Sequence, residues 1–293
     1  MEQSLKRILP PKVVQLLKNR RIRTKNNRLK KLPALSISQL EDIVRNKLGI
    51  MEGDVVLIHS SLGNLNLKCS PFEVLDLLLK IVGENGTILF PTYPKLTSLK
   101  FLEAEKVFNV SKTPSYMGIL SELARRHPNA VRSLHPTKSV VAIGKHADEL
   151  TKNHSESIYP YGEQSPYFKI NAFNGKTIGI GVSTKNLSCI HCVDDIMKDE
   201  FPVMPYADKV FDATCIDIDG NKKIVSTYAH EIRKMNYDIP KFIHKNVENE
   251  VCEDIDISGM KFFRADSTLL LEKLLSLAKE GITVYNKKHY RRR

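Results

Sequence analysis

Cysteines and long apolar runs are both scarce in this chain of 293 residues, and each scarcity excludes a class of protein. The five cysteines are scattered, and an odd, dispersed set does not build the disulfide framework of a small secreted domain. No apolar run approaches the roughly 20 residues that a membrane-spanning helix needs. The first residues, MEQSLKRILPPKVVQLLKNRR, carry prolines and charges where a secretory signal has an apolar core. We therefore expect a cytoplasmic protein.

Acidic residues are almost missing from the two ends. Residues 1–31 contain 11 Lys and Arg against one acid, a charge of +10, and residues 287–293 add 5 basic residues without an acid. Because the whole chain carries +12, removing +10 and +5 leaves −3 for residues 32–286. A near-neutral body is unlike the one-sided basic domain of a nucleic-acid-binding protein, and the chain has no nucleic-acid-binding motif. We expect no nucleic-acid partner, and residues 287–293 to be a basic tail.

The basic N-terminal segment has two interpretations. Apolar residues with helical spacing, interrupted by Pro10-Pro11, precede the stretch RRIRTKNNRLKK, which has almost nothing to bury. In the first interpretation, residues 1–35 are a solvated extension. In the second, residues 1–31 are a basic amphipathic anchor at the inner face of an anionic membrane, where each basic residue contributes about 1 kcal/mol. The apolar residues concerned are Leu5, Ile8, Leu9, Val13, Leu16 and Leu17.

Strands and helices alternate after residue 36, which predicts an α/β domain over residues 36–286. The β-branched run VVLIHSSL predicts a buried parallel strand, and the sheet is expected to be mixed and largely parallel, with flanking helices. The other predicted strands are TILFPTY, Ser139–Ile143 and Thr177–Val182. The predicted helices are Gln39–Leu48, capped by Ser38 with Glu41, then Phe72–Val82 and Ser115–Arg126.

The pattern changes after about residue 208. Two shorter strands, Val210–Ile218 and Lys223–Tyr228, are separated by Asp219-Gly220-Asn221, which predicts a hairpin. Helices are predicted around His230–Met235 and at Ser267–Lys279.

The segment Gly179–Asp195, GIGVSTKNLSCIHCVDD, carries the strongest indication of chemistry. It predicts a strand that ends in a turn of small residues and then a helix with His191 and Asp194 on one face. A histidine held by a carboxylate can take a proton from a nucleophile. The CxxC at Cys189–Cys192 has no second CxxC to complete a zinc site, so we interpret its cysteines as buried and inert and expect no metal.

Polar residues at the ends of several predicted strands should meet this segment. In open α/β sheets ligands bind beyond the carboxyl ends of the strands. His59, Pro91-Thr92 and Ser183–His191 all lie at such ends. We therefore expect these residues to converge on one site.

Several segments, in one order, resemble the aminoglycoside 3-N-acetyltransferase family, the antibiotic N-acetyltransferases that use acetyl-CoA. The most specific feature is the combination of HSSL, RSLHPTKS, SP and the His-x-x-acid helix. The resemblance runs over roughly residues 36–285 and implies that family's α/β fold rather than the GNAT fold. The matching segments are Gly53–Leu62, Val82–Tyr93, Ser115–Gly144, Tyr161–Ile170, Gly179–Asp195 and, more weakly, Gly259–Leu275.

The resemblance implies direct acetyl transfer from acetyl-CoA to an amine, with His191 as general base and Asp194 as its partner. Asp194 stands where the family usually has the longer Glu. The residues implied for acetyl-CoA binding are His59, Ser60, Ser61, Leu62, Thr92, Ser115, Met117, Gly118 and His135. For His59 and His135, a structural hydrogen bond is the alternative interpretation.

The amine acceptor is where the resemblance is weakest, because Leu187–Ile190 departs from the family's pattern ahead of the histidine. One candidate acceptor is an aminoglycoside, and the acidic run Glu248–Asp256 is either a cradle for such a polycation or a solvated loop. The other is a nucleotide- or lipid-linked amino sugar of a surface polysaccharide, which the basic N-terminus favours. A non-catalytic relative that binds CoA or sugar is a third hypothesis. The sequence leaves the oligomeric state open.

Overall fold

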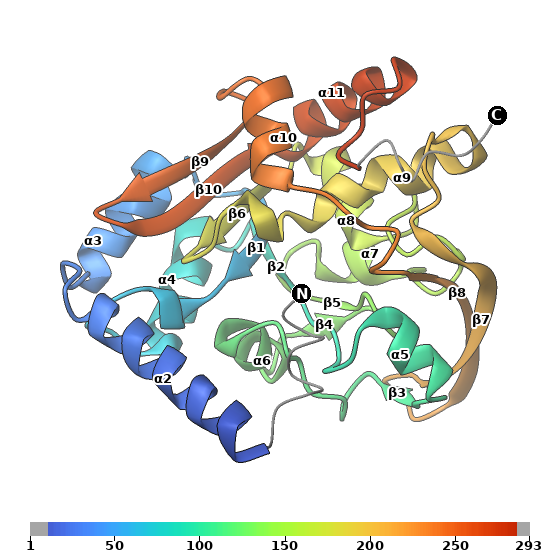
Figure 1. Cartoon of the computed structure of the whole chain (residues 1–293), viewed down its shortest axis with the longest axis horizontal. Coiled ribbons are helices and arrows are strands. Elements are labelled where there is room, and N and C mark those ends of the chain that lie inside the picture. Colours follow the sequence, from blue (N-terminus) through green and yellow to red (C-terminus); the bar gives the residue numbers. More distant parts are fainter. Residues whose placement is uncertain (1–10, 286–293) are drawn as a thin grey trace.

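A seven-stranded mixed sheet forms the centre of the computed structural model, which describes residues 11–285 (Figure 1). Its strand order is β4-β5-β2-β1-β6-β10-β9. Strand β1 runs parallel to both of its neighbours, β2 and β6, and antiparallel strands extend the sheet on either side. The strands are β1 (Val55–Ser60), β2 (Thr87–Pro91), β4 (Val131–Arg132), β5 (Val140–Gly144), β6 (Lys176–Ile180), β9 (Cys252–Ile257) and β10 (Met260–Asp266). The predicted α/β class and mixed sheet are confirmed.

Strand β1 is buried on both faces because its alternate residues enter different apolar clusters. Val55 and Leu57 belong to one cluster, and Val56 and Ile58 belong to the other. Successive side chains of a strand point to opposite faces, so a continuous apolar run suits a strand covered on both sides. The same alternation turns His59 toward the face that carries Val55 and Leu57.

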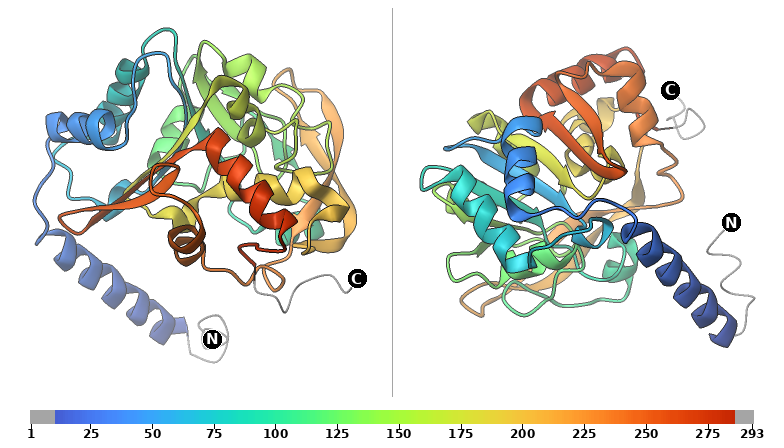
Figure 2. Two further views of the ribbon diagram at one scale, coloured as in Figure 1. Left: turned by 90° about the horizontal axis from the view of Figure 1, so that it is seen from above. Right: turned by 90° about the vertical axis from the view of Figure 1, so that its left-hand side faces the viewer.

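Helices cover both faces of the sheet, as the views in Figure 2 show. One face is covered by α3 (Ile37–Asp42), α4 (Pro71–Val82) and α6 (Ile119–Arg125). The other is covered by α7 (Ala147–Thr151), α8 (Pro166–Lys169), α9 (Cys192–Met197), α10 (Ile239–Asn246) and α11 (Ser267–Lys279). Short turns of 3-10 or π helix occupy Ile43–Lys47, Leu62–Asn64, Ile170–Phe173, Thr184–Asn186, Ser188–His191 and Lys198–Glu200.

A smaller sheet packs beside the first. It contains β3 (Phe108–Asn109), β7 (Tyr206–Ile216) and β8 (Lys222–His230), and α5 (Ser98–Glu103) packs on it. The antiparallel pairing of β7 with β8 confirms the predicted hairpin.

Three sequence predictions about helices are corrected. The cap of α3 is Ser36 rather than Ser38: its hydroxyl accepts from the backbone N–H of Gln39, whose side chain in turn accepts from the Ser36 N–H at 2.9 Å. Helix α6 begins at Ile119 rather than at residue 115 because Gly118 has a φ of +114°, which is not helical. No helix forms at residues 230–235: His230 ends β8, and the next helix is α10.

The second part of the acidic run is a strand rather than a solvated loop, whereas residues 248–251 form a turn. Residues 252–257 form β9, which pairs with β10 at the edge of the sheet. Acids of the run form ion pairs with Lys273, Arg264 and Lys261. Charged residues are common on edge strands, where they discourage pairing with another chain.

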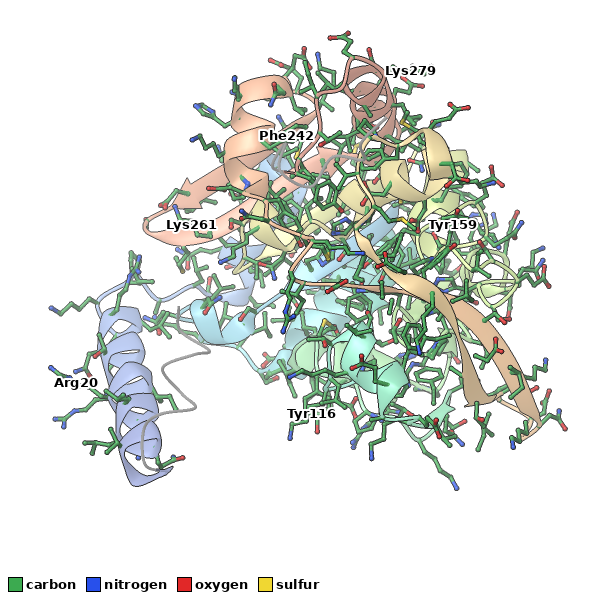
Figure 3. All side chains as sticks on the ribbon, turned by 45° about the vertical axis from the view of Figure 1, so that its right-hand side comes forward. Arg20, Tyr116, Tyr159, Phe242, Lys261 and Lys279 are labelled. Atoms are coloured by element: carbon green, nitrogen blue, oxygen red, sulfur yellow. The ribbon has the colours of Figure 1, made fainter. Side chains whose placement is uncertain are left out.

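Helix α2 (Pro11–Leu29) stands apart from the body (Figure 2). Leu16 is 68% exposed and Ile22 48% exposed, and Figure 3 shows Arg20 pointing away from the sheet. The chain rejoins the body at Leu32, whose carbonyl accepts from the Asn66 side chain at 2.9 Å. No helix within residues 11–285 combines the length and apolar content needed to cross a bilayer. Leu5, Ile8 and Leu9 lie outside the described residues.

Candidate functional site

The candidate site begins at the end of β6, where the chain turns away from the sheet. Gly181 follows this strand with a φ of +74°, and a Cβ there would lie 2.4 Å from the carbonyl oxygen of Ser61. The chain therefore needs glycine to turn so close to the end of β1. Two 3-10 turns follow, and helix α9 begins directly after His191.

Two contacts hold the segment that leads to His191. Asp254 on β9 accepts from both the backbone N–H and the hydroxyl of Thr184, each at 2.7 Å. His59 at the end of β1 accepts from the backbone N–H of Ser188 at 3.5 Å. The loop is thus tied both to the centre and to the edge of the sheet.

His191, Asp194 and Tyr285 form a compact hydrogen-bonded cluster. Nδ1 of His191 lies 3.1 Å from Oδ2 of Asp194 and 3.0 Å from the hydroxyl of Tyr285. That hydroxyl donates to the same Asp194 oxygen. Since the Tyr285 proton is directed at Asp194, the contact between His191 and Asp194 requires a hydrogen on Nδ1 of His191. Nε2 of His191 takes no part in these bonds.

The shorter side chain of Asp194 therefore reaches His191. The helix places the two residues on one face, and Tyr285 bridges them. Burial raises the pKa of Asp194, while its hydrogen bonds to His191 and Tyr285 act in the opposite direction. Its other oxygen, Oδ1, is buried without a hydrogen-bond partner within residues 11–285. Both carboxylate oxygens of Asp194 are thus buried, and Oδ2 orients the imidazole of His191 through its hydrogen bond to Nδ1.

A cleft of about 330 Å³ opens beside His191. The predicted residues His59, Ser60, Pro91 and Met117 line it. Of the strand ends expected to converge, His59, Pro91 and residues 185–188 do so, whereas Thr92 does not. Other lining residues include Tyr93, Ser121, Lys138, Tyr161, Lys185, Asn186, Leu187, Ser188, His230, Ile232, Met235 and Tyr237.

Six residues predicted for acetyl-CoA binding lie outside this lining. Thr92 and His135 are fully buried. Arg132 donates to the Thr92 hydroxyl at 3.1 Å, and Nδ1 of His135 accepts from the backbone N–H of Lys138 at 3.0 Å. These contacts favour the structural interpretation of His135. The other four are Ser61, Leu62, Ser115 and Gly118, which lie one or two positions from lining residues in the chain.

Two residues of the site have no counterpart among the sequence predictions. Tyr285 holds Asp194, and His230 packs 4.8 Å from the His191 ring. Lys138 also lines the cleft, and it lies inside the RSLHPTKS segment, one of the features that carry the family resemblance. Tyr285 follows α11 with no local pattern around it.

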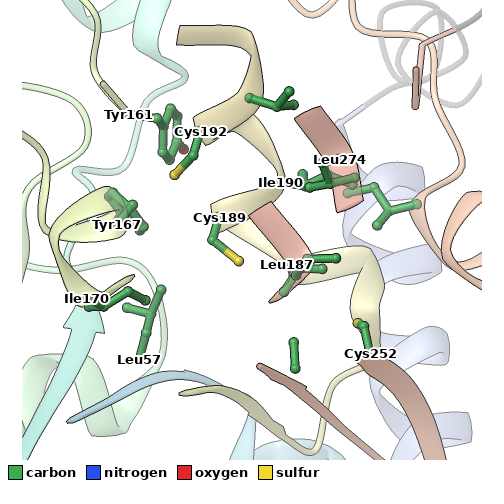
Figure 4. Close-up of a cluster of buried hydrophobic side chains, with 14 of the residues drawn as sticks. Leu57, Tyr161, Tyr167, Ile170, Leu187, Cys189, Ile190, Cys192, Cys252 and Leu274 are labelled. Atoms are coloured by element: carbon green, nitrogen blue, oxygen red, sulfur yellow. The ribbon is translucent and has the colours of Figure 1, made fainter. Parts of the chain in front are cut away.

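The two cysteines of the CxxC lie in an apolar cluster (Figure 4). All five cysteines are free, and Cys189 and Cys192 are buried. Burial raises the pKa of the Cys189 thiol to about 11 and that of Cys192 well above its usual range. A thiolate is the reactive form, so this environment suits inert thiols.

Donor atoms of His191, Asp194 and His230 lie within 4.8 Å of one another, close enough to be considered for a metal ion. The hydrogen bond between His191 and Asp194 uses two of the atoms that such an ion would need. The arrangement suits proton transfer within the cluster better than metal ligation.

Comparison with known proteins agrees with this geometry. The family model described as aminoglycoside 3-N-acetyltransferase matches residues 57–272. The aminoglycoside N(3')-acetyltransferase-like protein YokD of Bacillus subtilis is 29% identical over 180 residues, covering 55% of this chain and 65% of its own length. Aminoglycoside N(3)-acetyltransferase VII of Streptomyces paromomycinus is 28% identical over 159 residues, covering 49% of this chain and 55% of its own. The match thus spans half to two thirds of these relatives.

Solved structures share the fold over more of the chain. The acetyltransferase AAC-VIa bound to sisomicin superposes with a TM-score of 0.71 at 20% identity, covering 85% of this chain and 99% of its own. AAC-IIIb bound to CoASH gives a TM-score of 0.68 at 17% identity, covering 87% of this chain and 100% of its own. With the family model matching most of the chain, and with strand ends and His191 meeting at one cleft, this protein belongs to the aminoglycoside 3-N-acetyltransferase family.

Proposed function

We propose that this protein transfers an acetyl group from acetyl-CoA to the amino group of an aminoglycoside or another amino sugar. The observation that carries the proposal is the His191–Asp194–Tyr285 cluster, whose His191 lines a cleft at the strand ends. Family membership and the CoASH-bound neighbour support the same chemistry.

In this proposal His191 is the general base. A sugar amine is mostly an ammonium ion near neutral pH and cannot attack until it loses a proton. Nε2 of His191 takes this proton, while Nδ1–H stays directed at Asp194 and Tyr285. The buried carboxylate stabilises the imidazolium that forms and keeps the ring in one orientation.

The cleft suits the reactive end of acetyl-CoA. Acetyl-CoA supplies an acyl group that is already activated as a thioester, so the protein mainly needs to orient it and exclude water. Met117 and Leu187 give the cleft apolar surface, while Ser60 and Asn186 give it hydrogen-bonding groups. Such a mixture is typical of small-molecule sites.

Initial-rate kinetics with purified protein test the proposal. Acetyl-CoA and an amino sugar are varied together, and the product is analysed for an N-acetyl group by mass spectrometry. Intersecting double-reciprocal lines and an amide product are expected for direct transfer. Hydrolysis of acetyl-CoA without an amide product would contradict the proposal.

We further propose that residues 36–286 form the acetyltransferase domain and that residues 1–31 contact anionic membranes. Val13, Leu16 and Leu17 share one face of α2 and are exposed, and exposed arginines accompany them. Salt-sensitive co-sedimentation of the full chain with anionic vesicles, lost on deletion of residues 1–31, is the expected result. Equal vesicle binding by both forms would contradict the membrane contact. Loss of folding on deletion would contradict the domain boundary.

A further inference from the structure

The wall of the cleft has positive charge and no carboxylate. Lys138 and Lys185 line it, and no Asp or Glu lines it among residues 11–285. Burial lowers the pKa of His59 to about 4 and that of His230 well below its usual range, so both are neutral near pH 7. The two lysines therefore dominate the charge that a ligand meets. This is an unfavourable surface for a polycation.

Lys138 is the more deeply placed of the two. Its ammonium lies 4.7 Å from the ring centroid of Tyr93 and 5.4 Å from that of Tyr161. The acid that acts on it, Asp195, has both oxygens engaged elsewhere. Oδ1 accepts from Tyr206 at 2.5 Å, and Oδ2 accepts from the backbone N–H of Tyr161 at 2.6 Å.

The Lys138 ammonium makes neither a hydrogen bond nor an ion pair with any residue that the structure describes. Burial lowers its pKa to about 8, so it remains largely protonated near pH 7. This partly buried ammonium contacts two aromatic rings but makes no hydrogen bond within residues 11–285, and an anion that enters the cleft would supply that missing partner.

The surroundings of Lys138 are fixed before any ligand arrives. The Tyr93 hydroxyl accepts from Tyr167 at 2.7 Å, lies 3.1 Å from the Tyr161 hydroxyl and donates to Ser188 at 3.4 Å. The two rings that flank the ammonium are therefore held by one hydrogen-bond network. A preorganised cation of this kind is typical of a binding group.

The position of Lys138 indicates which ligand carries the anion. The Tyr161 ring lies 5.4 Å from the His191 ring, so base and lysine flank the same side chain. The pantetheine arm separates the thioester of acetyl-CoA from its phosphates. With the thioester beside His191, those phosphates lie far from Lys138. The acceptor, whose amine must also reach His191, is the ligand that can place an anion there.

We propose that Lys138 binds an anionic group of the acceptor, a carboxylate or a phosphate, so that the acceptor is an acidic amino sugar rather than an aminoglycoside. The inference rests on the proposed acetyl transfer. The acidic run of residues 248–256 supports it indirectly, because that run does not line the cleft and three of its five acids, Glu248, Glu253 and Asp256, pair with basic residues of the protein.

The test compares four acceptors with wild type and three variants. The acceptors are glucosamine, glucosamine 1-phosphate, 2-amino-2-deoxyglucuronic acid and gentamicin. Lys138→Met removes the cation, and Lys138→Arg retains it. Lys209→Met is the matched control, since that exposed ammonium lies 4.5 Å from the Phe211 ring, outside the cleft.

For wild type we expect kcat/KM about 10- to 100-fold higher with the matching acidic sugar than with glucosamine, as for one charged hydrogen bond. Lys138→Met should abolish this preference through KM, Lys138→Arg should keep part of it, and Lys209→Met should keep all of it. Comparing kcat/KM for glucosamine 1-phosphate and for 2-amino-2-deoxyglucuronic acid shows whether the anion that Lys138 binds is a phosphate or a carboxylate.

Two outcomes would overturn the proposal. One is gentamicin as the best acceptor of the wild type. The other is an equal loss of kcat by Lys138→Met on every acceptor, which would make Lys138 a donor to the reacting acyl oxygen. If the wild type acetylates none of the four sugars, the proposed acetyl transfer fails. The role of Lys138 in binding an anion is then tested separately by calorimetric binding of the same sugars. Tighter binding of an acidic sugar by wild type than by Lys138→Met supports it, and equal binding overturns it.

Discussion

Asp254 and Thr184 join the edge of the sheet to the loop that carries the proposed base. One carboxylate accepts both the backbone N–H and the hydroxyl of Thr184, each at 2.7 Å. The contact brings together residues 70 positions apart, and it gives Asp254, one acid of the run, a structural role.

Weakening this contact should loosen the loop without touching the reacting atoms. Asp254→Ala leaves the Thr184 N–H without its acceptor, and we expect kcat to fall about 3- to 30-fold. The matched control is Asp256→Ala on the same strand, an exposed acid that pairs with Lys261. Steady-state kinetics of the two variants make the comparison. Equal activity of both would contradict the positioning role of Asp254.

Removing the Tyr285 hydroxyl should lower turnover rather than binding. Tyr285→Phe deletes one of the two hydrogen bonds to Asp194 while keeping the buried ring. We expect kcat to fall about 10-fold, since a charged hydrogen bond contributes roughly 1.5–3 kcal/mol. The KM for acetyl-CoA should stay within about twofold. A change in that KM with unchanged kcat would place Tyr285 in cofactor binding instead.

Buried neutral histidines should make the fold sensitive to mild acid. Burial lowers the pKa of His59 and His154 to about 4, and lowers those of His135 and His230 well below 6.5. Between about pH 6.5 and pH 4 the unfolded chain binds more protons than the folded one, so stability falls as pH falls. Each such histidine contributes about 1.4 kcal/mol per pH unit.

Urea unfolding between about pH 7 and pH 5 measures this slope. Burial lowers the pKa of His154 to about 4, although the hydrogen bond from Nε2 to the Pro160 carbonyl at 3.0 Å acts in the opposite direction. His154→Asn should flatten the slope by about one proton, and His244→Asn, on the exposed side of α10, is the matched control. A wild-type stability that does not change over this range would refute the account.

The cysteines beside His191 should be dispensable for the chemistry. Both lie in the apolar cluster, and burial raises the pKa of each thiol. The double variant with Cys189→Ala and Cys192→Ala should keep an intersecting rate law and most of the wild-type kcat, after correction for folded fraction. Parallel lines for the wild type, or an acetyl thioester trapped on Cys192, would make a cysteine the nucleophile.

Sequence patterns predicted the central sheet and the proposed base because both are local in the chain. The apolar run of β1 and the small-residue turn before α9 are each contained in a stretch of about ten residues. His191 and Asp194, three residues apart, could be paired from helical periodicity alone.

Other residues of the site depend on tertiary packing, which local sequence patterns do not predict. Tyr285 meets His191 across 94 residues, and Lys138 enters the cleft only because β5 and its preceding loop pack beside β2. The acids of β9 indicate a solvated loop when the sequence is read alone. On an edge strand, acids can alternate with half-buried apolar residues such as Ile255.

The most direct test of the central claim is the acetylation rate of the His191→Ala variant. A general base acts in the transition state, so kcat should fall by about 10²–10⁴ while CoA binds with nearly unchanged affinity by calorimetry. Part of the lost rate should return when imidazole is added to the assay, since it can enter the space left by the side chain. A variant that turns over within about twofold of the wild type would contradict the assignment of His191 as the base.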